Sequence, residues 1–216
     1  MPAPYLPLLN QLDAWHRDAA ARHPGVIPCR PGCTACCHGP FDISVADVEA
    51  VRAGFQALDA EAKAAVTSAA TAHLDRMREL APEWKPPFDI AAIGDARFDQ
   101  ISDALADLPC PCLDAAGSCR IYAHRPLICR IMGLGLVTES GAVLDNGCPI
   151  QDEFPAYQAL AAQPFALEEW ETREESAKAD AAERLFGDRD RHGYETTIAV
   201  AIAHWRDDRR AATLPG

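Results

Sequence analysis

The stretch "CRPGCTACC", residues 29 to 37, places four cysteines within nine positions, two of them adjacent. Cys33 and Cys36 have two residues between them, a spacing at which one turn presents two sulfur atoms to one metal site. Cys29 and Cys33 form a looser version of the same unit. Adjacent side chains such as Cys36 and Cys37 point in different directions on almost any backbone. We therefore expect this pair to serve two metal ions, or one cluster and a neighbouring ion, rather than one small tetrahedral site.

The other five cysteines lie in a second segment of the chain, and the C-terminal third has none. Because four thiolate ligands must converge on a metal from different directions, this segment has to supply the second half of the ligand set. Eight thiolates fit two four-cysteine sites, or one cluster plus a structural metal, and leave a ninth thiol free. The alternative, that the cysteines are small buried apolar residues, is a common fate of free cysteine, but the clustering disfavours it. The five cysteines of this second segment are Cys110, Cys112, Cys119, Cys129 and Cys148.

Composition limits the classes of partner and the compartment. The 216 residues include 20 Lys and Arg against 32 Asp and Glu, a formal net charge of −12 that would repel nucleic-acid phosphates. The first twenty residues lack the pattern of a secretory signal, and no stretch approaches the ~18 apolar residues of a membrane span. We therefore expect a cytoplasmic protein with neither nucleic acid nor membrane as a partner. In a reducing cytosol, clustered thiols bind metal or do redox chemistry more often than they form disulfides.

Helical patterns surround both cysteine segments. Ser44 and Asp47 form an approximate capping box, Asp59 is typical of a second N-cap, and Gly187 of a helix stop. These signals predict two consecutive helices rather than one long rod in the first helical run. The helices are expected at about residues 4–23, 45–57, 60–80, 97–107 (the weakest pattern), 167–186 and 194–208.

The second cysteine segment has a different character. Its sequence predicts two short hairpins, one turning through Ala115 to Ser118 and one near Glu139 to Gly141. Pro126 can start a short helical turn that carries Cys129. The predicted fold class is therefore mainly α, a single domain with an irregular cysteine-rich loop and short-hairpin metal-binding core.

This fold divides into three parts along the sequence. Residues 1–28 are predicted to form an N-terminal helix, and residues 29–150 the cysteine-cluster metal-binding domain with a helical insertion at 44–107. Residues 151–216 are expected to be a C-terminal helical extension that packs on the same domain.

Other residue types add weaker signals. His38 follows the first cluster and could replace a thiolate or shuttle protons, but an exposed loop histidine is the simpler interpretation; His124 is similar. The acidic run "LEEWETREESAKADAAERL" is typical of a solvated helix face. Two groups are expected to have ordinary structural roles: the surface or helix histidines His16, His23, His73, His192 and His204, and the core tryptophans Trp15, Trp84, Trp170 and Trp205.

The chain resembles the YkgJ-type cysteine-cluster family, which has a CxxCxxCC signature and is described as zinc- or iron-chelating. The resemblance rests on "CRPGCTACC", "CPCLDAAGSCRIYAHRPLICR" and a later "NGCP", and it runs from Cys29 to Cys148. It differs in the first interval, which has three residues where the signature implies two. It also differs at Cys112, where the pattern is commonly hydrophobic, so Cys112 is assigned as the spare thiol.

The resemblance implies that the protein binds zinc or iron, and that the iron could be present as an iron–sulfur cluster. The metal ion is therefore the expected partner. Some relatives are described as flagellin lysine methylases, which implies an iron or iron–sulfur enzyme, such as a protein lysine N-methylase-like activity, as one alternative. A protein interaction module shaped by the metal is another. The implied ligands are Cys29, Cys33, Cys36, Cys37, Cys110, Cys119, Cys129 and Cys148, and the implied residues around them are Tyr122, Arg125 and Arg130, from a block that also holds Ile121 and Pro126.

Overall fold

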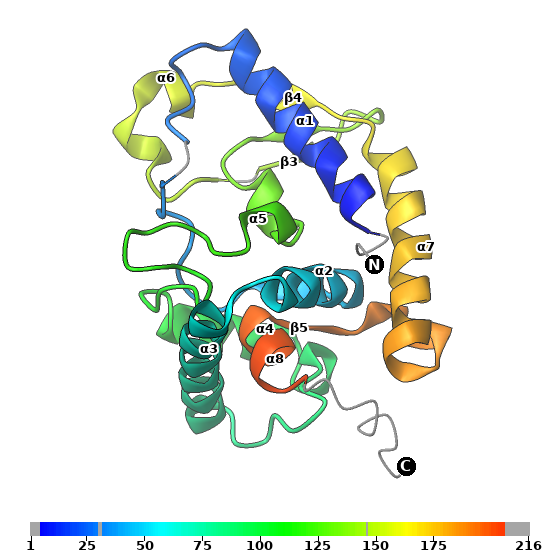
Figure 1. Cartoon of the computed structure of the whole chain (residues 1–216). Helices are drawn as coiled ribbons and strands as arrows, with labels where there is room; N and C mark the ends of the chain where they lie inside the picture. Colours follow the sequence, from blue (N-terminus) through cyan, green and yellow to red (C-terminus); the bar gives the residue numbers. More distant parts are fainter. Residues whose placement is uncertain (1–4, 30–31, 146, 206–216) are drawn as a thin grey trace.

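The computed structural model describes residues 5–29, 32–145 and 147–205, and the fold is mostly helical (Figure 1). The longer helices are α1 (Leu6–Arg22), α2 (Val45–Gln56), α3 (Ala60–Leu80), α4 (Asp95–Ala104) and α7 (Leu167–Phe186). Shorter helices are α5 (Ile128–Ile131), α6 (Pro155–Gln158) and α8 (Ile198–Ala203), together with four 3-10 turns at Ile90–Ala92, Tyr122–His124, Gln151–Glu153 and Arg189–Gly193. The strands are β1 (Asp42–Ser44), β2 (Leu136–Val137), β3 (Val143–Leu144), β4 (Gln163–Pro164) and β5 (Glu195–Thr197).

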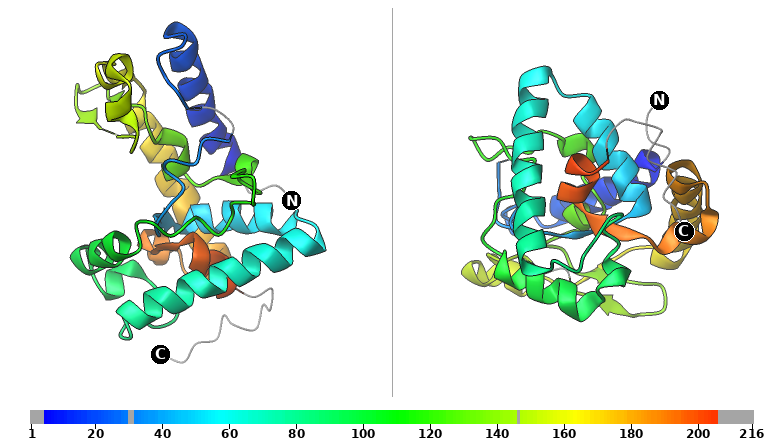
Figure 2. Two further views of the ribbon diagram at one scale, coloured as in Figure 1. Left: turned by 90° about the vertical axis from the view of Figure 1, so that its left-hand side faces the viewer. Right: turned by 90° about the horizontal axis from the view of Figure 1, so that it is seen from below.

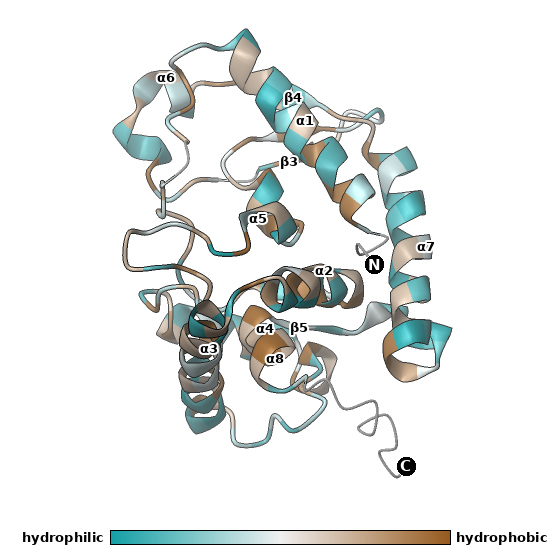
Figure 3. Cartoon of the chain, in the orientation of Figure 1, coloured by the Kyte–Doolittle hydropathy of each residue, from teal (hydrophilic) through white to brown (hydrophobic). Residues whose placement is uncertain are grey.

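Helices α2, α3, α7 and α8 form the body of the molecule, with α8 packed against both α2 and α3 (Figure 1). Helix α8 is hydrophobic along its whole length, whereas α7 exposes a hydrophilic face (Figure 3). Strand β1 leads directly into α2, β5 leads directly into α8, and the two strands pair antiparallel with Ile43 opposite Thr196. This pairing fixes the two central helices side by side, so the body is held together by apolar burial and one short ladder.

A second, smaller apolar cluster lies where α1 meets the three-stranded sheet of order β3-β2-β4. Strand β2 pairs antiparallel with β3 and parallel with β4. Trp15 of α1 packs in this cluster, and its indole Nε1 donates to the Pro164 carbonyl oxygen at 2.9 Å. Helix α1 rises away from the layer of α2 and α3 to reach this region (Figure 2, left).

Several sequence predictions about the helices are confirmed. The capping box of Ser44 and Asp47 is present, and the Asp59 side chain accepts from the Ala62 backbone N–H, so the first helical run is two helices. Gly187 ends α7 in the left-handed conformation, with φ 70°. Both hairpins are also found: Leu113 bridges Cys119, and β2 pairs with β3.

The helix predicted over 194–208 is wrong in its first half. Residues Glu195–Thr197 form β5, because their partner strand β1 offers a ladder and the β-branched threonines suit an extended backbone. The Thr197 side chain then caps α8 by accepting from the Val200 N–H. Residues 206–208 lie outside the described residues. The helix predicted at 97–107 is found at Asp95–Ala104, because Gly94 starts it earlier.

Two smaller predictions also need correction or completion. His73 lies on α3 as expected, but its side chain is buried rather than on the surface. Trp15, Trp84 and Trp170 are buried as predicted, and Trp205 is partly buried against the main core. No helix in the described ranges combines the length and the apolar character needed to cross a bilayer.

Candidate metal centre

A cavity of about 350 Å³ lies between α1, α5 and the two cysteine segments. Eight of the nine cysteines line it, and every one of them is a free thiol. The segments that carry them are far apart in the sequence, and no other class of side chain is so concentrated there. The lining cysteines are Cys29, Cys33, Cys36, Cys37, Cys110, Cys112, Cys119 and Cys129.

Backbone hydrogen bonds join the first cysteine loop to the start of the second segment. The Cys110 N–H donates to the Cys37 carbonyl oxygen at 2.8 Å, and His38 forms a β-bridge with Pro109. The Gly39 N–H donates to the Leu108 carbonyl oxygen at 2.7 Å. His38 is therefore part of the connection between the two segments and is absent from the cavity lining.

The hairpin around Ala115 to Ser118 brings Cys119 back beside Cys112. The Asp114 carboxylate accepts from the Ala116 and Ser118 N–H groups, which closes the turn, and Gly117 adopts a φ of 78° that favours glycine. The Arg120 N–H donates to the Cys112 carbonyl oxygen at 2.8 Å. Cys112 is buried in the main core, with 1% of its surface exposed, and it also borders the cavity.

Cys148 stands beside the cavity rather than in its lining. It lies close to the turn at Gly133, where an added Cβ would sit 3.4 Å from the Cys148 Cβ atom. Its backbone N–H donates to the Gln151 side chain at 3.2 Å. Cys29 is exposed as a residue, but its thiol is partly desolvated, and this raises its pKa. The thiols of Cys33, Cys36 and Cys148 raise that pKa further. Cys148 therefore lies on the Cys29 side of the centre.

The thiols influence one another strongly. A hydrogen bond with Cys37, and then burial, raise the pKa of Cys36, while burial raises the pKa of Cys129 and of Cys119. A hydrogen bond with Cys112 lowers the pKa of Cys110. Cys36, Cys119 and Cys129 therefore favour the protonated form, and a cation that enters the cavity would favour their thiolate form.

The chemistry of this donor set fits zinc, iron or an iron–sulfur cluster, all of which thiolates bind. In the part of the chain that the structure describes, no group of three or more His, Cys, Asp or Glu side chains is arranged to hold a metal ion. The thiols line the cavity wall, and coordination would require their side chains to turn toward a common point.

Tyr122, Arg125 and Arg130 also line this cavity. The Arg125 guanidinium carbon lies 3.8 Å from the centre of the exposed Tyr122 ring. Its positive charge opposes the upward pKa shifts of Cys29, Cys36, Cys119 and Cys129. Its Nε atom is buried and has no hydrogen-bond partner among the described residues. Arg125 is thus a positive charge that acts on cysteines of both segments.

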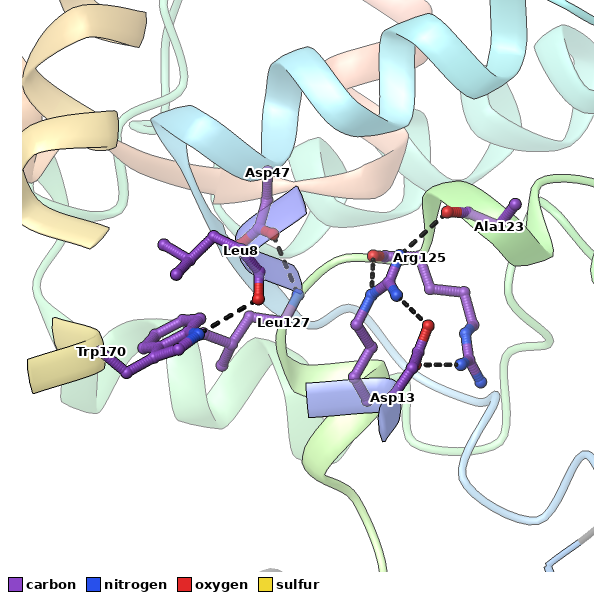
Figure 4. Close-up of polar contacts among 8 residues, drawn as sticks. Leu8, Asp13, Asp47, Ala123, Arg125, Leu127 and Trp170 are labelled. Atoms are coloured by element: carbon purple, nitrogen blue, oxygen red, sulfur yellow. Dashed lines mark hydrogen bonds and ion pairs between the residues drawn. The ribbon is translucent and has the colours of Figure 1, made fainter. Parts of the chain in front are cut away.

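Arg130 is fully buried and closes the turn that carries Cys129. Its Nε donates to the Arg125 carbonyl oxygen and its Nη2 to the Ala123 carbonyl oxygen, both at 2.9 Å (Figure 4). Its third contact is an ion pair with Asp13 of α1.

Sequence reasoning missed the wall that α1 supplies. Asp13, His16 and Arg17 line the cavity, and His16 had been assigned an ordinary surface or helix role. Burial, together with the nearby Arg125, lowers the pKa of His16. Nothing in the sequence marks these residues beyond their position beside the apolar stripe of α1.

Comparison with known proteins agrees with this geometry. A family model, CxxCxxCC, described as "Putative zinc- or iron-chelating domain", matches residues 28–149, more than half of the chain. Comparisons with curated proteins and with solved structures give no significant match. The matched range begins just before Cys29 and ends just after Cys148, so it contains all nine cysteines. The chain belongs to the CxxCxxCC family.

Proposed function

We propose that this protein binds zinc or iron through eight cysteine thiolates in one centre. The observation that carries the proposal is that both cysteine segments line a single cavity. Seven of the eight proposed ligands lie in that lining, and the thiol of the eighth, Cys148, is close enough to raise the pKa of Cys29. Tyr122, Arg125 and Arg130 surround the ligands, and the two arginines offset part of the negative charge that four thiolates bring to each divalent ion.

We assign the eight thiols to two groups that meet at the adjacent pair Cys36 and Cys37, whose thiols hydrogen-bond to each other. The thiols of Cys33, Cys36 and Cys148 are the neighbours that raise the pKa of Cys29. On the other side, the thiols of Cys110, Cys119 and Cys36 add to burial in raising the pKa of Cys129. Cys37 is bonded through its backbone to Cys110. This division supports two four-thiolate sites, Cys29, Cys33, Cys36 and Cys148 in one and Cys37, Cys110, Cys119 and Cys129 in the other.

Cys112 is the ninth thiol in this proposal and does not bind metal. It is buried in the main core, and its hydrogen bond with Cys110 and its burial raise its own pKa. A thiol that stays protonated next to Cys110 can donate a hydrogen bond to that sulfur.

An iron or iron–sulfur enzyme is the second candidate. The cavity volume of about 350 Å³ reaches the lower end of the range for small-molecule pockets, ~300–1,000 Å³. Non-ligand side chains such as His16, Phe41 and Met132 also line it. A purely structural site would be closed by its four protein ligands, whereas a catalytic site keeps an open position beside a pocket.

Single cysteine-to-serine variants test the ligand assignment. Protein is purified without oxygen, and metal per chain is measured by elemental analysis. Cys119→Ser and Cys148→Ser should each lose the metal of one site and keep that of the other, and Cys37→Ser should also lower the metal content. Cys112→Ser is the matched control and should keep the full amount.

Two results would overturn parts of the proposal. Loss of metal in Cys112→Ser with full retention in Cys29→Ser would show that the ligand set is wrong. Complete loss of metal in both Cys119→Ser and Cys148→Ser would contradict two separable sites and favour one shared cluster. The optical spectrum distinguishes the metals, because an iron–sulfur protein is brown with broad visible absorbance and a zinc protein is colourless.

A further inference from the structure

Helix α1 lies before the segment that the family model matches, yet it contributes to the cavity that the cysteines line. The side chain of Asp13 reaches from α1 to both arginines of the second cysteine segment. Its Oδ1 atom accepts from Arg125 Nη2 at 2.9 Å, and its Oδ2 atom accepts from Arg130 Nη1 (Figure 4). One carboxylate therefore holds two guanidinium groups at once.

Both arginine partners of Asp13 are largely buried, so loss of these ion pairs would leave their charges without compensation. The Arg130 side chain is 0% exposed and that of Arg125 is 18% exposed, so neither charge is compensated mainly by water. The other two hydrogen bonds of Arg130 go to backbone carbonyls, so among the described residues Asp13 supplies the one negative charge in direct contact with it. Removing a charged partner from a buried ion is strongly unfavourable, because the remaining charge stays desolvated.

Asp13 is connected to the cysteines through these arginines. Arg130 closes the turn from Ala123 to Arg130, and Cys129 precedes Arg130 directly. Arg125 is the cation close to cysteines of both proposed sites. If the carboxylate is lost, the turn loses its ion pairs with α1, and Arg125 loses the partner that holds it beside the thiols.

We propose that Asp13 is a positioning residue of the metal centre, which holds Arg125 beside the thiolates and, through Arg130, the turn that carries Cys129, and so makes α1 an integral part of the site. This inference rests on the proposed metal binding. Outer residues of this kind tune the affinity of a site without binding the metal, and their loss typically lowers metal affinity by about 10- to 100-fold.

The packing of α1 allows the role to be tested without unfolding the protein. Leu8, Leu9 and Leu12 anchor the helix in the main core, and Trp15 anchors it in the smaller cluster. Asp18 provides a matched control, because it is an acidic residue on the same helix that is exposed and does not line the cavity.

The experiment measures the affinity of the full-length, reduced protein for Zn²⁺ by competition with a coloured chelator. Asp13→Asn should bind Zn²⁺ about 10- to 100-fold more weakly than the wild type, Asp13→Glu should recover part of the loss, and Asp18→Asn should stay within about two-fold. The thermal stability of the metal-free protein is measured in parallel, because a purely structural role would lower that quantity alone. Unchanged Zn²⁺ affinity in Asp13→Asn, with or without lower stability, would overturn the inference.

A double variant tests the route through Arg125. Asp13→Asn should reduce Zn²⁺ affinity less in an Arg125→Gln background than in the wild type, because part of its effect has already been removed. Full additivity of the two losses would contradict the route. Wild-type protein that binds no metal would sink the proposed function itself, which is a different outcome from a wild type that binds metal and an Asp13 variant that binds it equally well.

Discussion

The helical body and the cysteine segments of this protein are held together in different ways. In the body, a single helix such as α3 buries three apolar residues, Val66, Ala70 and Met77, at 1% exposure or less. Between Cys110 and Cys148, which the structure describes apart from residue 146, no helix is longer than four residues and the strands have two residues each. The body can fold by apolar burial, whereas the cysteine segments depend on turns, buried ion pairs and, in our proposal, the metal.

Removal of the metal should have the largest effect and should act on one region. A chelator is expected to lower the melting temperature by about 10 °C, since a ligand present at ~1,000 times its dissociation constant contributes about 4 kcal/mol and each kcal/mol shifts a domain of this size by about 2–4 °C. Hydrogen exchange should become faster in the cysteine segments while α2, α3 and α8 stay protected. Metal removal with an unchanged unfolding curve would contradict the coupling.

A large-to-small substitution in the helical body should lower the stability of the protein without lowering its metal content. Met77 of α3 is fully buried, so Met77→Ala should lower the free energy of unfolding by about 2–5 kcal/mol. The metal content should stay at the wild-type value, because α3 does not line the metal cavity. Leu80→Ala, on the same helix at a 37% exposed position, is the control and should have a much smaller effect. Metal loss in Met77→Ala would show that the two regions are not independent.

Asp47 joins the two regions, because its carboxylate accepts from Ser44 in the body and from the Leu127 N–H in the cysteine segment at 2.9 Å. Burial raises its pKa to about 6, against about 3.9 in an unfolded chain. Between these values the folded protein holds a proton that the unfolded chain has released. The contribution of Asp47 to the free energy of unfolding therefore falls as the pH rises through this window and is constant above it.

The free energy of unfolding should fall by up to about 3 kcal/mol across this pH window because of Asp47. This fall should be absent in Asp47→Asn. Denaturant unfolding of both proteins across this pH range provides the measurement. Subtracting the two curves removes the contributions of other titrating groups, and a difference that does not vary with pH would show that Asp47 titrates normally.

The smallest effect is expected at the end of α7, a helix that contributes no residue to the cavity lined by the cysteines. Gly187 has a φ of 70°, a left-handed conformation that costs a side-chain-bearing residue about 1 kcal/mol. Gly187→Ala should lower the free energy of unfolding by that amount, with the metal content unchanged. Gly193→Ala, where an added Cβ would meet nothing within 4 Å and φ is not positive, is the matched control.

Local signals made the helices predictable, and the absence of local signals explains what was missed. Ser44, Asp47, Asp59 and Gly187 act on neighbouring backbone groups, so their roles can be read from the sequence. The pairing of β1 with β5 joins residues about 150 positions apart, and no local pattern encodes it.

The same contrast applies to the candidate site. The cysteines could be chosen by their spacing and by family resemblance, since both are properties of the sequence. Asp13 and His16 could not, because they reach the cavity only through the tertiary packing of α1. The polar contacts of Arg130 with Asp13 likewise depend on two segments more than 100 residues apart.

The most direct test of the account is the metal content of the wild-type protein purified without oxygen, measured by elemental analysis together with its optical spectrum. We predict zinc or iron bound in stoichiometric amount, with at least two metal ions per chain if both four-thiolate sites are filled. A reduced, folded preparation that contains neither zinc nor iron, and takes up neither when they are added, would contradict the central claim that the two cysteine segments form one metal centre.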